Sequence, residues 1–205
     1  RVHLPEIKHE ETEEDRIKDT RIMKLFKHHP MFVFGLFSLL AYEIAEISIN
    51  SYFINFVTGQ GWMDDNSASM VLTVALGFFM VGRFLGSWIM RRIPAERMLM
   101  YCSLGSVSCL GVVLLDIGHW SMYALIANYL FEAIMFPTIF SLSLQGLGNL
   151  TKSASSLLMM TPIGGCFFLL MGYVADQTNL VVPFLIPFIG YFIVLLYASE
   201  LSRKS

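Results

Sequence analysis

Six long apolar runs dominate this sequence and leave few folds open to it. A helix needs about 20 apolar residues to cross the hydrocarbon core of a bilayer, and each run approaches or exceeds that length. A soluble domain cannot hide so much apolar surface. We therefore predict an all-α membrane protein with six transmembrane helices. The predicted spans are about 31–57, 68–90, 98–117, 120–144, 154–175 and 180–199.

Charged side chains are scarce and unevenly placed along the chain. They make up 15% of the residues, against roughly a quarter in an average soluble domain. Of the 30 formally charged side chains (14 basic and 16 acidic), 14 lie in residues 1–27. We therefore predict a cytoplasmic segment over 1–29, part of it an amphipathic helix, a membrane domain over 30–200 and a cytoplasmic tail over 201–205. The first residue is Arg1 and not Met, so we expect this segment to belong to a longer protein.

The basic residues predict the direction in which the chain crosses the membrane. Loops that stay in the cytoplasm carry an excess of Lys and Arg. With the N-terminal segment inside, the successive inside segments hold seven, three, one and two basic residues, and the three outside loops hold none. The remaining basic residue, Arg83, lies within a span. We therefore expect a multi-pass protein of the cytoplasmic (inner) membrane, with both ends of this chain in the cytoplasm.

Four ionisable residues lie deep inside the predicted spans, where charge is costly. A charge at the centre of a bilayer costs about 2.5–3.5 kcal/mol on insertion scales. Such residues therefore face a water-filled cavity or one another, and they usually mark functional sites. Arg83 lies about seven residues from the cytoplasmic end of its span, so we expect a structural or gating role for it. The four residues are Glu43 and Glu46 in the first span, Arg83 in the second and Glu132 in the fourth.

The deep acids are accompanied by amides and an aromatic ring. The spacing of Glu43, Glu46 and Asn50 places them on one face of the first helix. In the fourth span Asn128 lies one turn before Glu132, and Phe136 lies one turn after it. Carboxylates and amides exchange hydrogen bonds with hydroxyls, and an aromatic ring stacks on the C–H face of a sugar. These six residues therefore predict a binding site for a neutral polyol. A buried Glu can also exchange a proton, which suits proton coupling.

Helix-breaking residues interrupt two of the predicted spans. Pro137 removes a backbone donor just after Glu132, and Pro162 does so in the middle of the fifth span. Gly164 and Gly165 loosen the turn that follows Pro162. Such breaks in transporters often lie at the binding site or at moving parts, while the alternative is a static kink for packing. We assign these four residues a gating or structural role.

Three blocks of sequence resemble the C-terminal half of the fucose permease family of the major facilitator superfamily. They begin Tyr42-Glu-Ile-Ala-Glu-Ile-Ser-Ile-Asn, Gly82-Arg-Phe-Leu-Gly-Ser-Trp and Phe136-Pro-Thr-Ile-Phe-Ser-Leu, and they occur in the expected order. Some relatives carry Tyr where this chain has Phe136, so a sugar-binding hydroxyl is missing at that position. The resemblance implies that the six spans correspond to helices 7–12, built as 3+3 inverted repeats, with residues 1–29 as the end of the central loop.

The same resemblance implies a hexose or fucose:proton symporter that works by alternating access. The expected partners are the sugar, the lipid bilayer and an N-terminal six-helix half, with the proton as coupling ion and no other cofactor. The family's coupling acids are attributed mainly to the N-terminal half, so we assign Glu46 and Glu132 chiefly to sugar binding. A net charge of −2 provides no basic surface for nucleic acid.

Other classes of function are weighed against this interpretation. One alternative is a self-contained six-helix protein that dimerises as a small transporter or channel. Another is a non-transporting sugar sensor built on the same fold. An enzyme would need a nucleophile and a base, and His119, the only histidine after residue 29, falls in an outer loop. No hydrolase motif, phosphate loop or metal-ligand spacing occurs, so we expect neither enzyme activity nor a metal site.

Overall fold

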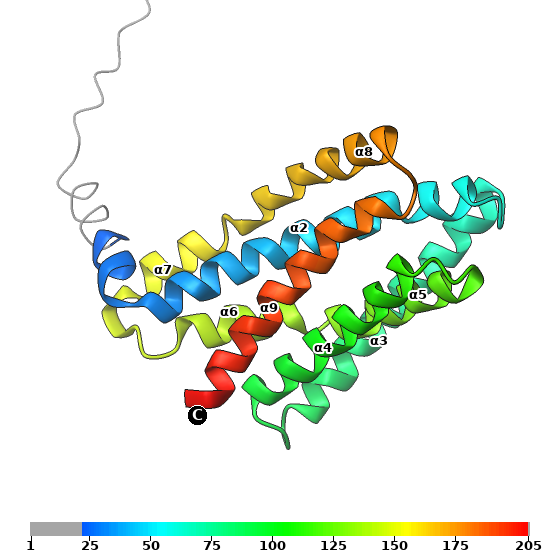
Figure 1. Ribbon diagram of the computed structural model, residues 1–205. Coiled ribbons are helices and arrows are strands. Elements are labelled where there is room, and N and C mark those ends of the chain that lie inside the picture. Colours follow the sequence, from blue (N-terminus) through cyan, green and yellow to red (C-terminus); the bar gives the residue numbers. More distant parts are fainter. Residues whose placement is uncertain (1–21, 205) are drawn as a thin grey trace, which may run out of the picture.

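The computed structural model describes residues 22–204, and most of this stretch is helical (Figure 1). Of the predicted cytoplasmic segment, residues 1–21 lie outside the described part, and residues 22–28 are helical. No strand occurs among the residues described. The helices are α2 (Pro30–Gly59), α3 (Asp65–Ile89), α4 (Ala95–Leu114), α5 (His119–Glu132), α6 (Met135–Leu144), α7 (Thr151–Leu158), α8 (Phe168–Gln177) and α9 (Leu185–Lys204), with short 3-10 turns η1 (Gly148–Leu150), η2 (Thr161–Phe167) and η3 (Val182–Phe184).

Six helical stretches are long and apolar enough to cross a bilayer, which confirms the predicted number. The fourth combines α5 with α6, and the fifth combines η1, α7, η2 and α8. The sixth begins with η3 and continues as α9. The fourth and fifth spans contain the breaks expected at the prolines. The six stretches are Pro30–Gly59, Asp65–Ile89, Ala95–Leu114, His119–Leu144, Gly148–Gln177 and Val182–Arg203.

The boundary between the third and fourth spans differs from the prediction. We expected the third span to continue to residue 117, but α4 ends at Leu114. The connection that follows contains two residues with positive φ, Asp116 at 49° and Gly118 at 59°. Residues in that conformation cannot continue a right-handed helix. The tight turn therefore begins within residues 98–117, the range that hydropathy alone assigned to the third span.

Helix α2 is the central element of the bundle. It packs against α9, η2 and α6, whereas α3 packs mainly against α5 and α4 lies between α5 and α9. In Figure 1, α7 and α8 run along one side of α2, and α3, α4 and α5 lie together on the other side of α9. The breaks in the fourth and fifth spans are thus next to α2, the helix that carries two of the deep acids.

A glycine allows α2 and α9 to approach closely. A Cβ atom added at Gly190 of α9 would lie 2.7 Å from the carbonyl oxygen of Ala41 and 3.1 Å from the Cβ of Ala45. Small residues at such a crossing bring the two backbones together. This contact fixes the depth at which α9 meets α2, and therefore the position of the aromatic residues next to it.

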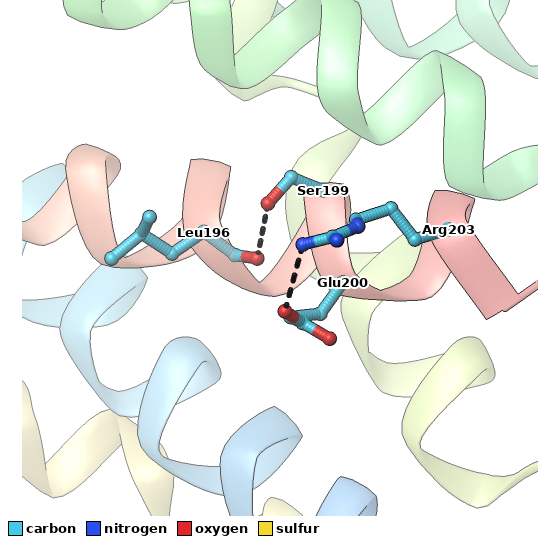
Figure 2. A network of polar contacts seen from close by, with 4 residues as sticks. All are labelled: Leu196, Ser199, Glu200 and Arg203. Carbon is cyan, nitrogen blue, oxygen red and sulfur yellow. Dashed lines mark hydrogen bonds and ion pairs between the residues drawn. The ribbon is translucent and has the colours of Figure 1, made fainter.

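The last turns of α9 are polar and carry the only ion pair found among the described residues. The Arg203 Nη1 atom lies 3.7 Å from Glu200 Oε1, and the Ser199 hydroxyl donates to the Leu196 carbonyl at 2.8 Å (Figure 2). Both charged side chains are exposed, and exposed pairs of this kind contribute less than about 1 kcal/mol. The pair marks the end of the apolar part of α9 and has no part in the core.

The close contact at Gly190 predicts a position-specific cost. Gly190→Ala must push α9 away from backbone atoms of α2, and overpacking of this kind costs about 1–3 kcal/mol. We expect a lower melting temperature for the purified protein in detergent. Gly111→Ala in α4 is the matched control, because a Cβ atom there meets nothing within 4 Å. Equal melting temperatures for the two variants would contradict the close approach.

Candidate functional site

The fourth span is interrupted directly after Glu132. Helix α5 ends at that residue, and α6 begins at Met135, so the backbone is irregular over two residues. Irregular backbone at membrane depth is tolerated only where protein groups or a water-filled cavity satisfy its polar atoms. The Glu132 carbonyl accepts a hydrogen bond of 3.0 Å from the Tyr42 hydroxyl of α2. The break is therefore tied to the central helix.

The side chain of Glu132 is completely buried and held by two donors. The Asn128 amide nitrogen donates to Glu132 Oε2 at 2.8 Å, and the Tyr191 hydroxyl donates to the same oxygen at 2.5 Å. Short bonds of this kind are expected when a carboxylate accepts them. The other carboxylate oxygen, Oε1, and the Asn128 side-chain oxygen have no hydrogen-bond partner among the residues described. Two buried acceptors, one on each of these hydrogen-bonded residues, are thus left without a donor in the described part of the chain.

Aromatic rings surround this carboxylate. The Tyr42 and Tyr191 rings meet edge to face with centroids 6.2 Å apart, and the Tyr42 ring lies 6.4 Å from that of Phe136. Phe136 is half-buried and stacks on Phe140 at 6.2 Å. The rings exclude water from one side of Glu132, which strengthens its hydrogen bonds. The Tyr191 ring therefore lies next to the carboxylate, and Phe136 packs against the Tyr42 ring.

The acidic stripe of α2 adopts the expected arrangement on one helix face. Glu43 is 7% exposed, and Glu46 and Asn50 are half-buried. Glu46 lies near enough to Glu132 for the two carboxyl groups to interact electrostatically, and Glu43 interacts in the same way with Glu46. The Asn50 side-chain oxygen is buried without a partner among the described residues. Glu46 and Glu132 thus influence each other electrostatically, and their role in sugar binding stays a prediction.

The Arg83 side chain extends from α3 to the break between α5 and α6. Its Nε atom donates to the Ala133 carbonyl at 3.2 Å, and its guanidinium lies 4.9 Å from the centre of the Phe79 ring. The side chain is largely exposed, and it interacts electrostatically with Glu46. Arg83 thus contacts one helix that carries a deep acid and lies within electrostatic range of the other.

The break in the fifth span packs against the middle of α2. Pro162 is the second residue of η2. A Cβ atom at Gly164 would lie 2.9 Å from the Leu40 side chain, and one at Gly165 would collide with Ile47. The two glycines therefore permit close packing of η2 on α2. This packing supports the structural half of our assignment for these residues, and the gating half stays a prediction.

Two tyrosines of the site, Tyr42 and Tyr191, were not among the candidate residues. Each lies in an apolar run, where its spacing is the same as that of a residue that only packs. A general signal exists, because a buried tyrosine hydroxyl normally finds a hydrogen-bond partner. That signal does not single out Tyr42 and Tyr191, because the Tyr197 hydroxyl bonds to Ser143, and the buried Tyr129 hydroxyl has no partner among the described residues.

Comparisons with known proteins agree with the arrangement of the helices. Residues 2–168 match the family model of the Major Facilitator Superfamily. The glucose/galactose transporter of Brucella abortus (strain 2308) is 34% identical over 175 residues, which cover 84% of this chain and 42% of that protein. The L-fucose-proton symporter of Escherichia coli (strain K12) is 30% identical over 167 residues, which cover 80% of this chain and 38% of that protein.

A solved structure shares the fold. The crystal structure of a major facilitator superfamily transporter, FucP, in the outward conformation matches 89% of this chain and 44% of its own chain, with a TM-score of 0.84 and 28% identity. The chain spans less than half the length of each of these three proteins. The six apolar helices and these matches identify a multi-pass membrane protein.

The two hydrogen bonds to Glu132 predict a contrast between two buried tyrosines. Tyr191→Phe removes a donor from a carboxylate, and loss of a hydrogen bond to a charged group costs about 1.5–3 kcal/mol. Tyr129→Phe is the matched control, because the Tyr129 hydroxyl is buried without a partner among the described residues. We expect thermal melts in detergent to show a clear loss for Tyr191→Phe and none for Tyr129→Phe. A loss in the control as large as that in Tyr191→Phe would count against the role of the hydroxyl.

Proposed function

The chain belongs to the Major Facilitator Superfamily, and from this membership we propose that it forms the C-terminal half of a proton-coupled sugar transporter. The proposed substrate is a hexose or fucose. The relatives named for glucose, galactose and fucose support this class of substrate. Their greater length is consistent with a second half as the partner of this one. Membership of a transporter superfamily sets aside the enzyme interpretation.

One observation carries the proposal: the buried Glu132 carboxylate has one oxygen held by Asn128 and Tyr191 and the other unused. A buried polar atom without a partner is costly, and such atoms in native proteins often have a functional explanation. A sugar hydroxyl donates the hydrogen bond that Oε1 lacks. The donors on Oε2 hold the carboxylate in place, so the free oxygen is already oriented before sugar binds.

Each candidate residue has a role in this mechanism. The carboxyl and amide groups of the site accept from and donate to sugar hydroxyls, and Phe136 stacks on the C–H face of the ring. The breaks at Pro137 and Pro162, with Gly164 and Gly165, allow the helices to adjust while the two halves rock about the site. Arg83 holds the break in place. The residues that bind sugar are Glu43, Glu46, Asn50, Asn128 and Glu132.

We propose the proton as the coupling ion and the cytoplasmic membrane as the location. The similarity to a protein named L-fucose-proton symporter supports coupling to a proton. The asymmetric distribution of Lys and Arg supports an orientation with both ends of this chain in the cytoplasm. Glu46 and Glu132 serve chiefly as sugar ligands in this scheme.

The free oxygen of Glu132 generates the first functional prediction. Glu132→Gln keeps an oxygen for Asn128 and Tyr191 but replaces the free acceptor with an NH₂ donor. Loss of a hydrogen bond to a charged group costs about 1.5–3 kcal/mol, which corresponds to roughly 10- to 100-fold weaker sugar affinity. The measurement is sugar binding and uptake by the protein that contains both halves. Glu200→Gln in the exposed end of α9 is the control, and wild-type affinity for Glu132→Gln would contradict the assignment.

The second functional prediction concerns this chain by itself. One half supplies only one wall of the transport cavity, so the chain alone cannot alternate access between two sides. Proteoliposomes that contain only this chain should show no sugar counterflow, and co-reconstitution with an N-terminal half should restore it. Counterflow by the chain alone would favour the alternative in which two copies form a small transporter.

A further inference from the structure

The Ala133 carbonyl lacks its usual backbone donor for a covalent reason. In a continuous α-helix this carbonyl accepts a hydrogen bond from the N–H group four residues later. That residue is Pro137, which has no N–H. The missing bond would lie in the middle of the fourth span, where an unsatisfied carbonyl is especially costly. The Arg83 Nε atom occupies this position as donor, 3.2 Å from the carbonyl oxygen.

Two glycines in α3 bring Arg83 close enough to reach the break between α5 and α6. Gly82 and Gly86 are buried on either side of Arg83. A Cβ atom at Gly82 would lie 2.8 Å from the Leu130 carbonyl and 3.1 Å from the Ala133 Cβ atom, and one at Gly86 would collide with Ile134. Only glycines allow α3 to lie this close to the junction of α5 and α6. The close approach places the side chain between them within reach of a backbone carbonyl.

The neighbouring carbonyls also accept bonds from side chains. The Glu132 carbonyl accepts from the Tyr42 hydroxyl at 3.0 Å, and the Ile134 carbonyl accepts from the Thr138 hydroxyl at 2.7 Å. Three consecutive carbonyls at the break therefore have side-chain donors, and two of these come from other helices. Ala133 differs from the other two, because its own helix has no N–H group to offer in place of the side chain.

The Arg83 side chain does not extend towards the membrane surface. An arginine that snorkels directs its charged end to the lipid head groups. Here the Nε atom points sideways to a neighbouring helix, and the guanidinium stays over the Phe79 ring at 4.9 Å. The charge of Arg83 also interacts with that of Glu46 in the acidic stripe of α2.

We propose that Arg83 is a positioning residue that replaces the N–H group absent at Pro137, and that it thereby fixes the break from which Glu132 meets the sugar. The inference rests on the proposed function for its effect on sugar, whereas the compensation between Arg83 and Pro137 stands on the hydrogen-bond geometry alone. The bond between Arg83 and the Ala133 carbonyl connects α3 to the proposed binding site. If α3 moves against a second half, this bond would shift the backbone next to Glu132.

The test is a rescue experiment, because Pro137→Ala restores the missing N–H group. Arg83→Gln, Pro137→Ala and the double variant are prepared in the protein that contains both halves, with Arg92→Gln as control. Arg92 lies just beyond the same helix, and its guanidinium lies 5.8 Å from the centre of the exposed Trp88 ring. Affinity for glucose, galactose and fucose is measured by equilibrium binding, and the melting temperature is measured without sugar.

We expect Arg83→Gln to weaken sugar affinity about tenfold and to lower the melting temperature. Arg92→Gln should remain within about twofold of wild type, and the double variant should recover to within about threefold. Pro137→Ala alone provides the reference for the effect of restoring the N–H group. Wild-type affinity in Arg83→Gln, or a double variant no better than Arg83→Gln, would overturn the proposal. If Arg83→Gln does not fold, a folded double variant supports the compensation and an unfolded one contradicts it.

Sugar binding and the compensation between Arg83 and Pro137 are tested by separate measurements. If the wild-type protein binds none of the three sugars, the proposed function is wrong. The melting temperatures then still decide the compensation between Arg83 and Pro137: recovery in the double variant supports it, and absence of recovery contradicts it.

Discussion

A carboxylate removed from water inside a helical bundle is stable only when hydrogen-bond donors replace the water that it has lost. Glu132 meets this condition through Asn128 on its own helix and Tyr191 on α9. Its backbone carbonyl is joined to α2 by Tyr42. Three helices therefore converge on one residue, and the position of each depends on the others. We propose that the oxygen left without a partner among the described residues, Glu132 Oε1, receives a sugar hydroxyl.

The breaks in the helices follow the same physical rule. Non-helical backbone inside a membrane protein must be buried in protein or line a polar cavity. The fourth and fifth spans are broken beside α2: the Tyr42 hydroxyl of α2 bonds to the first break, and the glycines of η2 pack on α2 at the second. In the described part of the chain, these two breaks and the deep acids Glu43, Glu46 and Glu132 thus lie on or next to α2.

Most of the fold was predictable because hydropathy and helical periodicity are local properties of the sequence. The six spans, the breaks at Pro137 and Pro162, and the shared face of Glu43, Glu46 and Asn50 all follow from spacing. Partners from other helices do not. Tyr191 lies 59 residues from Glu132, and nothing in its own apolar run distinguishes it from a packing residue. The short third-to-fourth connection was also misplaced, because its two positive φ angles have no hydropathy signal.

The central claim is that the free oxygen of Glu132 receives a sugar hydroxyl. A structure of the protein with both halves and a bound hexose or fucose tests it most directly. The account predicts a sugar hydroxyl within about 3 Å of Glu132 Oε1, with Tyr191 and Asn128 still bound to Oε2. A sugar bound elsewhere, with Glu132 enclosed between α5 and α9 and untouched by it, would contradict the account.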